Sequence, residues 1–340
     1  MRDTKPTTAD EKFMRLALTQ ARKGLGKTHP NPAVGAVIVK GKRVVASGWH
    51  RGAGRPHAEI EAIRAYKKST AGATIYITLE PCSTHGRTPP CTEAIVAGKF
   101  ARVVYGATDP NPKHAGRARR ILQKAGLEVT EGVLGTECTH LNADWNKWIV
   151  TGHPYVIAKA GLTLDGRISS HPESRWITNE RSRRDAMKLR SRVGAILVGA
   201  GTVREDDPHL TIRGITGATQ PWRVVVCRSG QLPARAKLFT DEHKDKTLVF
   251  ASLKTALRQL GKLGVVCVLI EGGGQILGEA FDRSLVDEVC FYLAPLMAGG
   301  PTPAVAGLGV GRNEDAIRLA SVHYRRFGND VRMSGSVLKN

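Results

Sequence analysis

Four side chains in the first third of the sequence have the types and spacing of a catalytic metal centre. His57 and Glu59 stand two residues apart, and Cys82 and Cys91 border a loop that contains glycine and proline. One imidazole and two thiolates provide three zinc ligands and leave the fourth position to water, the open arrangement of catalytic zinc sites. Zinc lowers the pKa of such a water towards neutrality. Glu59 is then placed to take the proton of the water and deliver it to a leaving amine.

The spacing of the two cysteines departs from the commonest zinc motif. Eight residues separate Cys82 from Cys91 instead of two, yet His-x-Glu and the two Pro-Cys steps match the signature of zinc-dependent deaminases. The alternative is a closed structural zinc site, which needs a fourth ligand, and His85 is the only candidate nearby. One histidine and two thiolates favour zinc over harder cations.

A second group of candidate residues lies near position 270. Gly272, Gly273 and Gly274 follow an apolar run and precede an expected helix. Glycines at a helix N-terminus allow backbone amides to approach a phosphate group. The order is not Gly-x-Gly-x-x-Gly, so the usual dinucleotide-binding fingerprint is not met. A tight turn between a strand and a helix is the alternative interpretation.

The elements that must position these residues alternate between helix and strand. The first part predicts helices at residues 9–23, 58–66, 92–97 and 114–125 and strands at 34–39, 44–48, 74–79, 103–106 and 128–129. The pattern restarts near residue 151, with a strand at 155–164, a helix at 181–192 and strands at 195–198, 223–227, 247–251, 265–270 and 288–293. Such alternation is typical of α/β layers. We therefore expect two α/β domains, residues 1–148 and 149–340.

The net charge of +21, from 51 Lys and Arg against 30 Asp and Glu, first suggests a nucleic-acid-binding protein. The excess is spread over both halves, +12 in residues 1–148 and +9 in the remainder, without a block of consecutive basic residues. Aromatic residues make up only 5%, which is few for a surface that stacks unpaired bases. We therefore do not expect nucleic acid as a partner.

Cysteine usage and hydropathy indicate a cytoplasmic protein. The six cysteines are too dispersed for a small disulfide scaffold, and Cys227, Cys267 and Cys290 lie in apolar runs where cysteine acts as a small hydrophobic residue. No apolar run reaches the roughly 18 residues that a membrane span needs. The first 12 residues are charged, so we expect neither a secretory signal nor a membrane segment.

Longer motifs around these residues carry a family resemblance. Residues 29–35 read His-Pro-Asn-Pro-Ala-Val-Gly, and residues 79–91 read Leu-Glu-Pro-Cys-Ser-Thr-His-Gly-Arg-Thr-Pro-Pro-Cys. With His-Ala-Glu at 57–59 they closely resemble the bifunctional deaminase/reductase family of riboflavin biosynthesis. The Gly-Arg-Thr-Pro-Pro-Cys segment separates this family from cytidine, guanine and tRNA deaminases. The resemblance extends from about residue 11 to about residue 300 and is weaker beyond.

For the first half, the resemblance implies a cytidine-deaminase-like three-layer domain. This domain would convert 2,5-diamino-6-(5-phosphoribosylamino)pyrimidin-4(3H)-one to the corresponding uracil. Asn31 would contact the pyrimidine, and Arg87 would help to position the substrate. Relatives often have histidine where this chain has Thr84, which makes His85 the candidate substitute for that contact.

For the second half, the motifs at 159–166, 176–178, 201–203 and 206–211 follow the order of the reductase half of the same family. The resemblance implies a dihydrofolate-reductase-like domain that uses NADPH to reduce the ribosyl group of the product to ribityl. The residues implied in cofactor binding are Gly161, Trp176, Thr202, Asp206, Gly273 and Gly274. The residues implied in substrate binding are Lys159, Asp165, Ser174, Arg190, Leu210, Arg213 and Glu271.

Two of these assignments have physical alternatives. Arg190 and Arg213 suit a phosphate because guanidinium binds phosphate oxygens in a two-pronged geometry. The alternative for Arg190 is a solvated position on a basic helix face. Lys159 and Asp165 are both candidates to polarise or protonate the sugar oxygen, and the sequence does not choose between them.

Other functions compete with the two-step enzyme. The charge and the deaminase signature together suggest a nucleic-acid editor, but this hypothesis leaves the motifs of the second half unexplained. A second alternative is that one half has lost its activity and serves as a scaffold. Domains of these two types commonly associate, so we expect a homo-oligomer.

Overall fold

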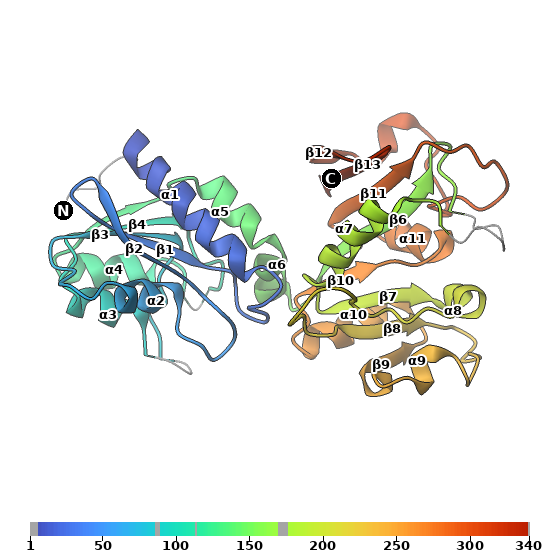
Figure 1. Cartoon of the computed structure of the whole chain (residues 1–340), viewed down its shortest axis with the longest axis horizontal. Helices are drawn as coiled ribbons and strands as arrows, with labels where there is room; N and C mark the ends of the chain where they lie inside the picture. Colours follow the sequence, from blue (N-terminus) through green and yellow to red (C-terminus); the bar gives the residue numbers. More distant parts are fainter. Residues whose placement is uncertain (1–5, 86–88, 113, 169–175, 339–340) are drawn as a thin grey trace. The chain divides into compact units, whose positions relative to one another are not determined.

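The computed structural model describes residues 6–85, 89–112, 114–168 and 176–338. The chain divides into two compact units, Met1–Gly152 and His153–Asn340, and each is described by itself (Figure 1). Within the described ranges, no helix combines the length and the apolar character needed to cross a membrane.

Among its described residues, the first unit contains one mixed sheet and six α-helices. The strands are β1 (Gly35–Lys40), β2 (Arg43–Trp49), β3 (Thr74–Leu79), β4 (Arg102–Ala107) and β5 (Glu128–Glu131). The helices are α1 (Thr8–Ala21), α2 (Ala58–Ala65), α3 (Cys91–Ala97), α4 (Arg117–Lys124), α5 (Gly135–Leu141) and α6 (Ala143–Thr151), with a 3-10 turn η1 (Arg22–Gly24).

The sheet of the first unit has the order β2-β1-β3-β4-β5, with β3, β4 and β5 parallel and β1 antiparallel to both neighbours. The central strand β3 is buried over nearly its whole length because helices cover both faces of the sheet. Helices α2, α3 and α4 cover one face, and α1 and α5 lie on the other (Figure 1). The three-layer α/β arrangement predicted from the resemblance is therefore confirmed.

The second unit contains a larger mixed sheet. Its strands are β6 (Tyr155–Thr163), β7 (Ala195–Gly199), β8 (Trp222–Val226), β9 (Thr247–Phe250), β10 (Cys267–Ile270), β11 (Glu288–Ala294), β12 (Leu319–Phe327) and β13 (Asp330–Val337). Its helices are α7 (Glu180–Arg190), α8 (Ala200–Asp206), α9 (Lys237–Thr240), α10 (Leu253–Lys262) and α11 (Gly274–Asp282), with 3-10 turns η2 (Lys244–Lys246) and η3 (Asn313–Asp315).

The strand order in this sheet is β12-β13-β11-β6-β10-β7-β8-β9. Strands β11, β6, β10, β7, β8 and β9 run parallel, so their carboxyl ends share one edge. Val156, Ala158, Ala160 and Leu162 of β6 face the core built with α10 and α11. Since side chains alternate along a strand, Lys159 lies on the opposite face of the sheet.

The segment after residue 300, for which the sequence predicted no role, completes the second unit. Strands β12 and β13 form an antiparallel hairpin, and β13 pairs with β11. Ahead of the hairpin, Ala304 is buried, and the amide of Ala306 donates to the carbonyl of Gly274 over 2.9 Å. The described residues after Gly300, up to residue 338, therefore contribute two strands to the second sheet and Ala304 to its core.

Candidate active sites

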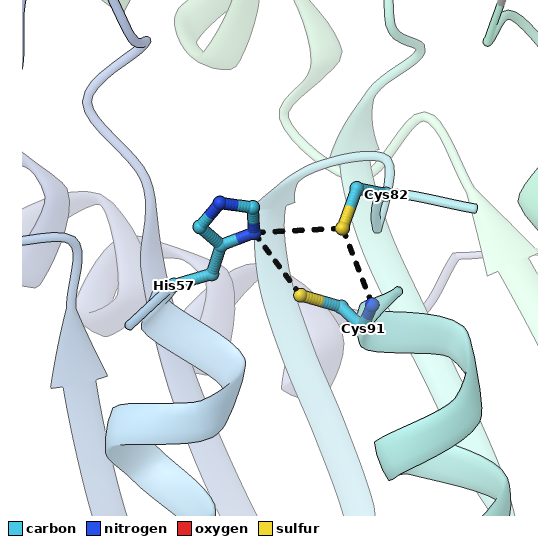
Figure 2. A group of neighbouring side chains, drawn as sticks. All are labelled: His57, Cys82 and Cys91. Carbon is cyan, nitrogen blue, oxygen red and sulfur yellow. Dashed lines mark hydrogen bonds between the residues drawn. The ribbon is translucent and has the colours of Figure 1, made fainter. Parts of the chain in front are cut away.

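The three expected zinc donors meet at the carboxyl end of β3 (Figure 2). His57 is the N-cap of α2, Cys91 is the first residue of α3, and Cys82 lies in the loop that follows β3. The backbone amide of Cys91 donates to Sγ of Cys82 over 3.2 Å. Two helix N-termini, which carry partial positive charge, thus lie at the donors and favour the thiolate forms that bind zinc.

The distances between the donor atoms fit a single zinc ion. Nδ1 of His57 lies 3.2 Å from Sγ of Cys91 and 3.5 Å from Sγ of Cys82. The three donor atoms all lie within 4.8 Å of one another. Zinc bonds of about 2.0–2.3 Å in a tetrahedron require donors roughly 3.3–3.8 Å apart, so small adjustments accommodate the ion. In the described part of the chain, this is the only such group of histidine, cysteine or carboxylate side chains.

Glu59 lies beside the donors on the first turn of α2 and is only 3% exposed. Burial and the nearby Cys82 thiolate raise the pKa of Glu59 to about 6. A carboxyl group with this pKa exchanges protons near neutral pH, which suits a general acid and base. The geometry therefore agrees with the role expected for Glu59.

The two cysteines titrate as a pair. Hydrogen bonds from Cys91 and His57 lower the pKa of Cys82 to about 4, against the effect of burial. The hydrogen bond to Cys82 and burial raise the pKa of the Cys91 thiol. Without a metal, one proton is thus retained between the two sulfurs, and a bound cation would replace it.

Asn31, the residue expected to contact the pyrimidine, is held by a histidine that sequence reasoning missed. Nδ2 of Asn31 lies 3.0 Å from Nε2 of His50, and Nδ1 of His50 lies 3.0 Å from the carbonyl oxygen of Pro56. A carbonyl oxygen can only accept, so Nδ1 of His50 carries the proton, and Nε2 accepts from Asn31. His50 is 2% exposed, and burial lowers its pKa, which keeps it neutral. A lone histidine after a strand carries no sequence pattern that announces this contact.

The loop that carries Asn31 is clamped by residues from the end of the first unit. Asn142 accepts from the amide of Ala33 over 2.8 Å and donates to the carbonyl of Ala33 over 3.0 Å. Asp144 pairs with His29 over 3.1 Å. Helices α5 and α6, which the sequence did not predict, are therefore part of the framework of this site.

His85 has two expected roles, as a fourth zinc ligand and as the substitute for the substrate contact at position 84, and the geometry bears on the first. Its side chain is 74% exposed and lies 3.7 Å from Glu93, away from the donor group. It therefore provides no fourth zinc ligand, and the alternative of a closed structural site fails. Thr84 contacts His114 instead, with 3.3 Å between Thr84 Oγ1 and His114 Nδ1. Arg87 lies outside the described residues.

In the second unit, a buried group of charges lies at the carboxyl end of β10, beside the middle of β6. Glu271 accepts from Nε of Arg190 over 2.7 Å and from a terminal nitrogen of Arg190 over 2.9 Å. Nζ of Lys159 lies 3.3 Å from the same carboxylate. Burial opposes ionisation of Glu271, but the charges of Arg190 and Lys159 lower its pKa to about 2. The Arg190 side chain is only 12% exposed, so the alternative of a solvated helix face is wrong.

Asp165 has a different environment from Lys159. Its carboxylate accepts hydrogen bonds from the hydroxyl of Thr163 and from the amides of Ala298 and Gly299. These bonds lower the pKa of Asp165 to about 2. A carboxylate this acidic holds no proton near neutral pH, so Asp165 anchors the turn at 298–299 and is unsuited to protonate a substrate.

The three glycines after β10 serve different purposes. A Cβ atom on Gly272 would lie 1.8 Å from Cγ2 of Ile276, and one on Gly274 would lie 2.3 Å from the carbonyl oxygen of Pro303. These two glycines are required by packing, as in the tight-turn interpretation. A Cβ on Gly273 would meet nothing closer than Oγ1 of Thr202, at 3.8 Å. Of the three glycines, Gly273 therefore has the most open surroundings. It lies next to Thr202, another residue expected to bind the cofactor.

The other expected reductase residues are spread around the same edge of the sheet. Trp176 is 55% exposed, carries the guanidinium of Arg183 over its ring at 4.8 Å and lines a groove of about 630 Å³. Gly161 lies on β6, Asp206 is exposed at the end of α8, and Arg213 is exposed in the following loop. Leu210 is buried and has a φ of 49°. Ser174 lies outside the described residues.

The fold and the donor set define the class: a zinc-type nucleobase deaminase domain joined to a second α/β domain with its own site. Residues 7–107 match the model of the cytidine and deoxycytidylate deaminase zinc-binding region. Residues 154–333 match that of the RibD C-terminal domain. The chain belongs to the RibD family, the bifunctional deaminase/reductases of riboflavin biosynthesis.

Relatives cover almost the whole chain. The riboflavin biosynthesis protein RibD of Synechocystis sp. is 40% identical, covering 98% of this chain and 97% of the relative. RibD of Escherichia coli is 37% identical, covering 95% and 98%. Among solved structures, Acinetobacter baumannii RibD is 35% identical with a TM-score of 0.89, covering 97% and 99%. A Thermotoga maritima diaminohydroxyphosphoribosylaminopyrimidine deaminase/5-amino-6-(5-phosphoribosylamino)uracil reductase is 32% identical with a TM-score of 0.86, covering 97% and 99%.

Proposed function

We propose that the chain deaminates 2,5-diamino-6-(5-phosphoribosylamino)pyrimidin-4(3H)-one and then reduces the ribosyl group of the product to ribityl with NADPH. Deamination is assigned to residues 1–148 and reduction to residues 149–340. The observation that carries the first step is the convergence of His57, Cys82 and Cys91 beside the buried Glu59. The similarity to the Thermotoga maritima diaminohydroxyphosphoribosylaminopyrimidine deaminase/5-amino-6-(5-phosphoribosylamino)uracil reductase supports the choice of substrates.

In the deamination step, His57, Cys82 and Cys91 would hold zinc. When bound, zinc supplies a water whose pKa lies near neutrality. Glu59, whose pKa is about 6, accepts the proton of the attacking water and returns it to the leaving ammonia. Asn31 is fixed by His50, so its amide oxygen and its second N–H remain to orient the pyrimidine ring.

In the reduction step, NADPH supplies the hydride. The chain orients the reactants and provides a proton. Lys159 is the candidate proton donor because its Nζ belongs to the buried charge group, 3.3 Å from the Glu271 carboxylate, whereas Asp165 is committed to the turn at 298–299. Arg190 donates two hydrogen bonds to the Glu271 carboxylate and so holds it in place.

The remaining assignments of the resemblance form part of this proposal. The cofactor would be bound by Gly161, Trp176, Thr202, Asp206, Gly273 and Gly274. The adjacency of Gly273 and Thr202 and the position of Trp176 in a groove support these assignments. Exposed Arg213 is available to a substrate phosphate. Ser174 and Arg87 are proposed on the resemblance alone.

A cytoplasmic location and a homo-oligomeric state also belong to the proposal. None of the six cysteines, all of which lie in the described ranges, forms a disulfide bond, which suits a reducing compartment. Sedimentation of the purified chain at several concentrations measures the oligomeric state, and a monomer at all concentrations would refute that part.

The test is a two-part assay of the purified chain. With zinc present, the protein should release ammonia from the diaminopyrimidine phosphate and then oxidise NADPH, faster than it oxidises NADH. Glu59→Gln should reduce ammonia release at least about 100-fold, while NADPH oxidation with pre-deaminated substrate stays unchanged. Loss of both activities in a folded Glu59→Gln protein would contradict two separate sites. Absence of ammonia release from the zinc-loaded native chain would contradict the deaminase proposal.

A further inference from the structure

The loop after β4 carries a histidine, His114, that the resemblance did not assign and that contacts the loop of Cys82 through Thr84. Strands β3 and β4 are parallel neighbours, with Leu79 paired to Ala107 at their carboxyl ends. The loops that leave these two ends therefore start side by side at one edge of the sheet. The first loop carries Cys82 and Thr84, and the second carries His114.

Glu80 fastens the second loop to the first. Its carboxylate is almost completely buried and accepts from the backbone amides of Asp109 at 3.2 Å, Gly116 at 3.0 Å and Ala118 at 3.0 Å. The amide of Glu80 also donates to the carbonyl of Ala107 over 2.8 Å. A buried carboxylate with three amide partners is a strong attachment, since each bond is charge-assisted. The loop after β4 is thereby attached to Glu80, which lies two residues before the expected zinc ligand Cys82 in the sequence.

His114 lies within this fastened loop and reaches the zinc-binding loop. Its amide donates to the carbonyl of Asn111 over 2.8 Å, which fixes its backbone. Nδ1 of its ring lies 3.3 Å from Oγ1 of Thr84. Among the described residues, no protein group bonds to Nε2 of His114. Burial raises the pKa of Asp109 in the same loop, and the charges of His114 and Cys82 also act on this pKa, which agrees with the proximity of the two side chains.

We propose that His114 is a substrate-binding residue of the deaminase site, with Nε2 as the atom that contacts the substrate. The inference rests on the proposed deamination. When the Thr84 hydroxyl donates to Nδ1, the ring carries its proton on Nε2 and can donate to an acceptor oxygen. The phosphorylated pyrimidine offers such oxygens on its ring carbonyl and on its phosphate. Thr84 sets the orientation of the ring, and Glu80 sets the position of the loop.

The first experiment compares His114→Ala with His140→Ala, a matched control because His140 is an exposed histidine of α5 without an assigned role. Loss of one substrate hydrogen bond should raise the KM for ammonia release about ten-fold and leave kcat within about three-fold. His140→Ala should match the native chain. Zinc content and NADPH oxidation with pre-deaminated substrate should be unchanged in both variants. Native KM in His114→Ala would overturn the proposal, as would loss of zinc together with the activity.

The second experiment places the imidazole at position 84 instead of position 114, on the other side of the contact between Thr84 and His114. Because Thr84 and His114 touch, the double variant Thr84→His/His114→Ala presents an imidazole from the opposite side of the same contact. It should recover most of the affinity that His114→Ala loses, which a purely structural role of His114 would not produce. A double variant no better than His114→Ala would overturn the proposal.

A dephosphorylated substrate shows which oxygen of the substrate, on the phosphate or on the pyrimidine, Nε2 of His114 contacts. If the effect of His114→Ala on KM disappears with this substrate, Nε2 contacts the phosphate; if it persists, Nε2 contacts the pyrimidine. Both results uphold the contact. The native chain is the reference for the deamination itself. Ammonia from the native chain with no effect of His114→Ala refutes only this inference, whereas no ammonia from the native chain refutes the proposed function.

Discussion

The side-chain amide of Asn31 donates a hydrogen bond of 3.0 Å to Nε2 of His50. The second ring nitrogen of His50 donates to the carbonyl of Pro56, so a buried, neutral imidazole with one defined tautomer sets the orientation of Asn31. The ring of His50 also meets the ring of His57 edge-on, with centroids 5.2 Å apart. The residue expected to recognise the pyrimidine is thus aligned by a histidine adjacent to the zinc donors.

Replacement of His50 by phenylalanine should weaken substrate binding without removing the metal. Phenylalanine keeps a ring against His57 but offers no acceptor to Asn31, so the amide loses its fixed orientation. We expect the KM for ammonia release to rise about ten-fold, with zinc content unchanged. Asn31→Ala/His50→Phe should be no worse than Asn31→Ala alone. Additive effects of the two substitutions would show that His50 acts independently of Asn31.

Alanine substitutions at adjacent glycines should separate cofactor binding from packing. Gly274→Ala places a methyl group against the Pro303 carbonyl and should destabilise the chain by roughly 1–3 kcal/mol. Gly273→Ala has room for the methyl group within the protein and should leave the melting temperature unchanged while raising the KM for NADPH. Thermal melts and NADPH titrations check both. A destabilised Gly273→Ala protein, or one with native KM, would contradict the proposed role of Gly273.

The buried carboxylate of Glu271 should make the stability of the second unit depend on acid pH. Its pKa is about 2 in the folded chain against an ordinary value of 4.5, so it contributes stability above pH 4.5 that is lost as the pH falls towards 2. Glu271→Gln leaves Arg190 and Lys159 without their buried counter-ion and should cost about 3–5 kcal/mol at pH 7. The difference in the free energy of unfolding between the native chain and the variant, measured by urea unfolding, should become smaller below pH 4.5. A difference that stays constant from pH 7 to pH 3 would contradict this account.

Substitutions of Lys159 and of Asp165 should have very different effects on kcat for NADPH oxidation. Lys159→Met keeps the length of the side chain but removes the proton donor, and should lower kcat for NADPH oxidation at least about 100-fold. Asp165→Asn retains an acceptor for the turn at 298–299 and should keep kcat within a few-fold of the native value. Ammonia release serves as the internal control in both proteins. The reverse ranking would identify Asp165 as the donor.

Much of the first site could be predicted because its chemistry depends on short, contiguous motifs. His57 and Glu59 lie on one helix turn, and each cysteine follows a proline at the start or end of a loop, so residue type and spacing together indicate a metal. His50 and His114 are single histidines without such a pattern. Their partners, Asn31 and Thr84, are 19 and 30 residues away, and only the folded chain shows the contacts.

The same reasoning explains the partial prediction of the fold. Apolar strands such as β3 and β10 are visible in the sequence because burial on both faces demands continuous hydrophobic residues. Helices α5 and α6 and the hairpin of β12 and β13 were not predicted. The outer strand β12 is largely exposed, so it carries no strong hydrophobic period. Helix α5 is seven residues long and includes glycine and two threonines, which are weak helix formers.

The sequence by itself indicated the candidate zinc donors and determined the α/β class and the family, since these depend on the types of neighbouring residues. Tertiary structure alone decided which charged groups neutralise one another and which remain available for chemistry. It paired Glu271 with Arg190 and Lys159, committed Asp165 to a turn and turned His85 towards solvent. The physical reason is that ionisation and hydrogen bonding depend on distances of a few ångströms between residues far apart in the chain, and only packing sets those distances.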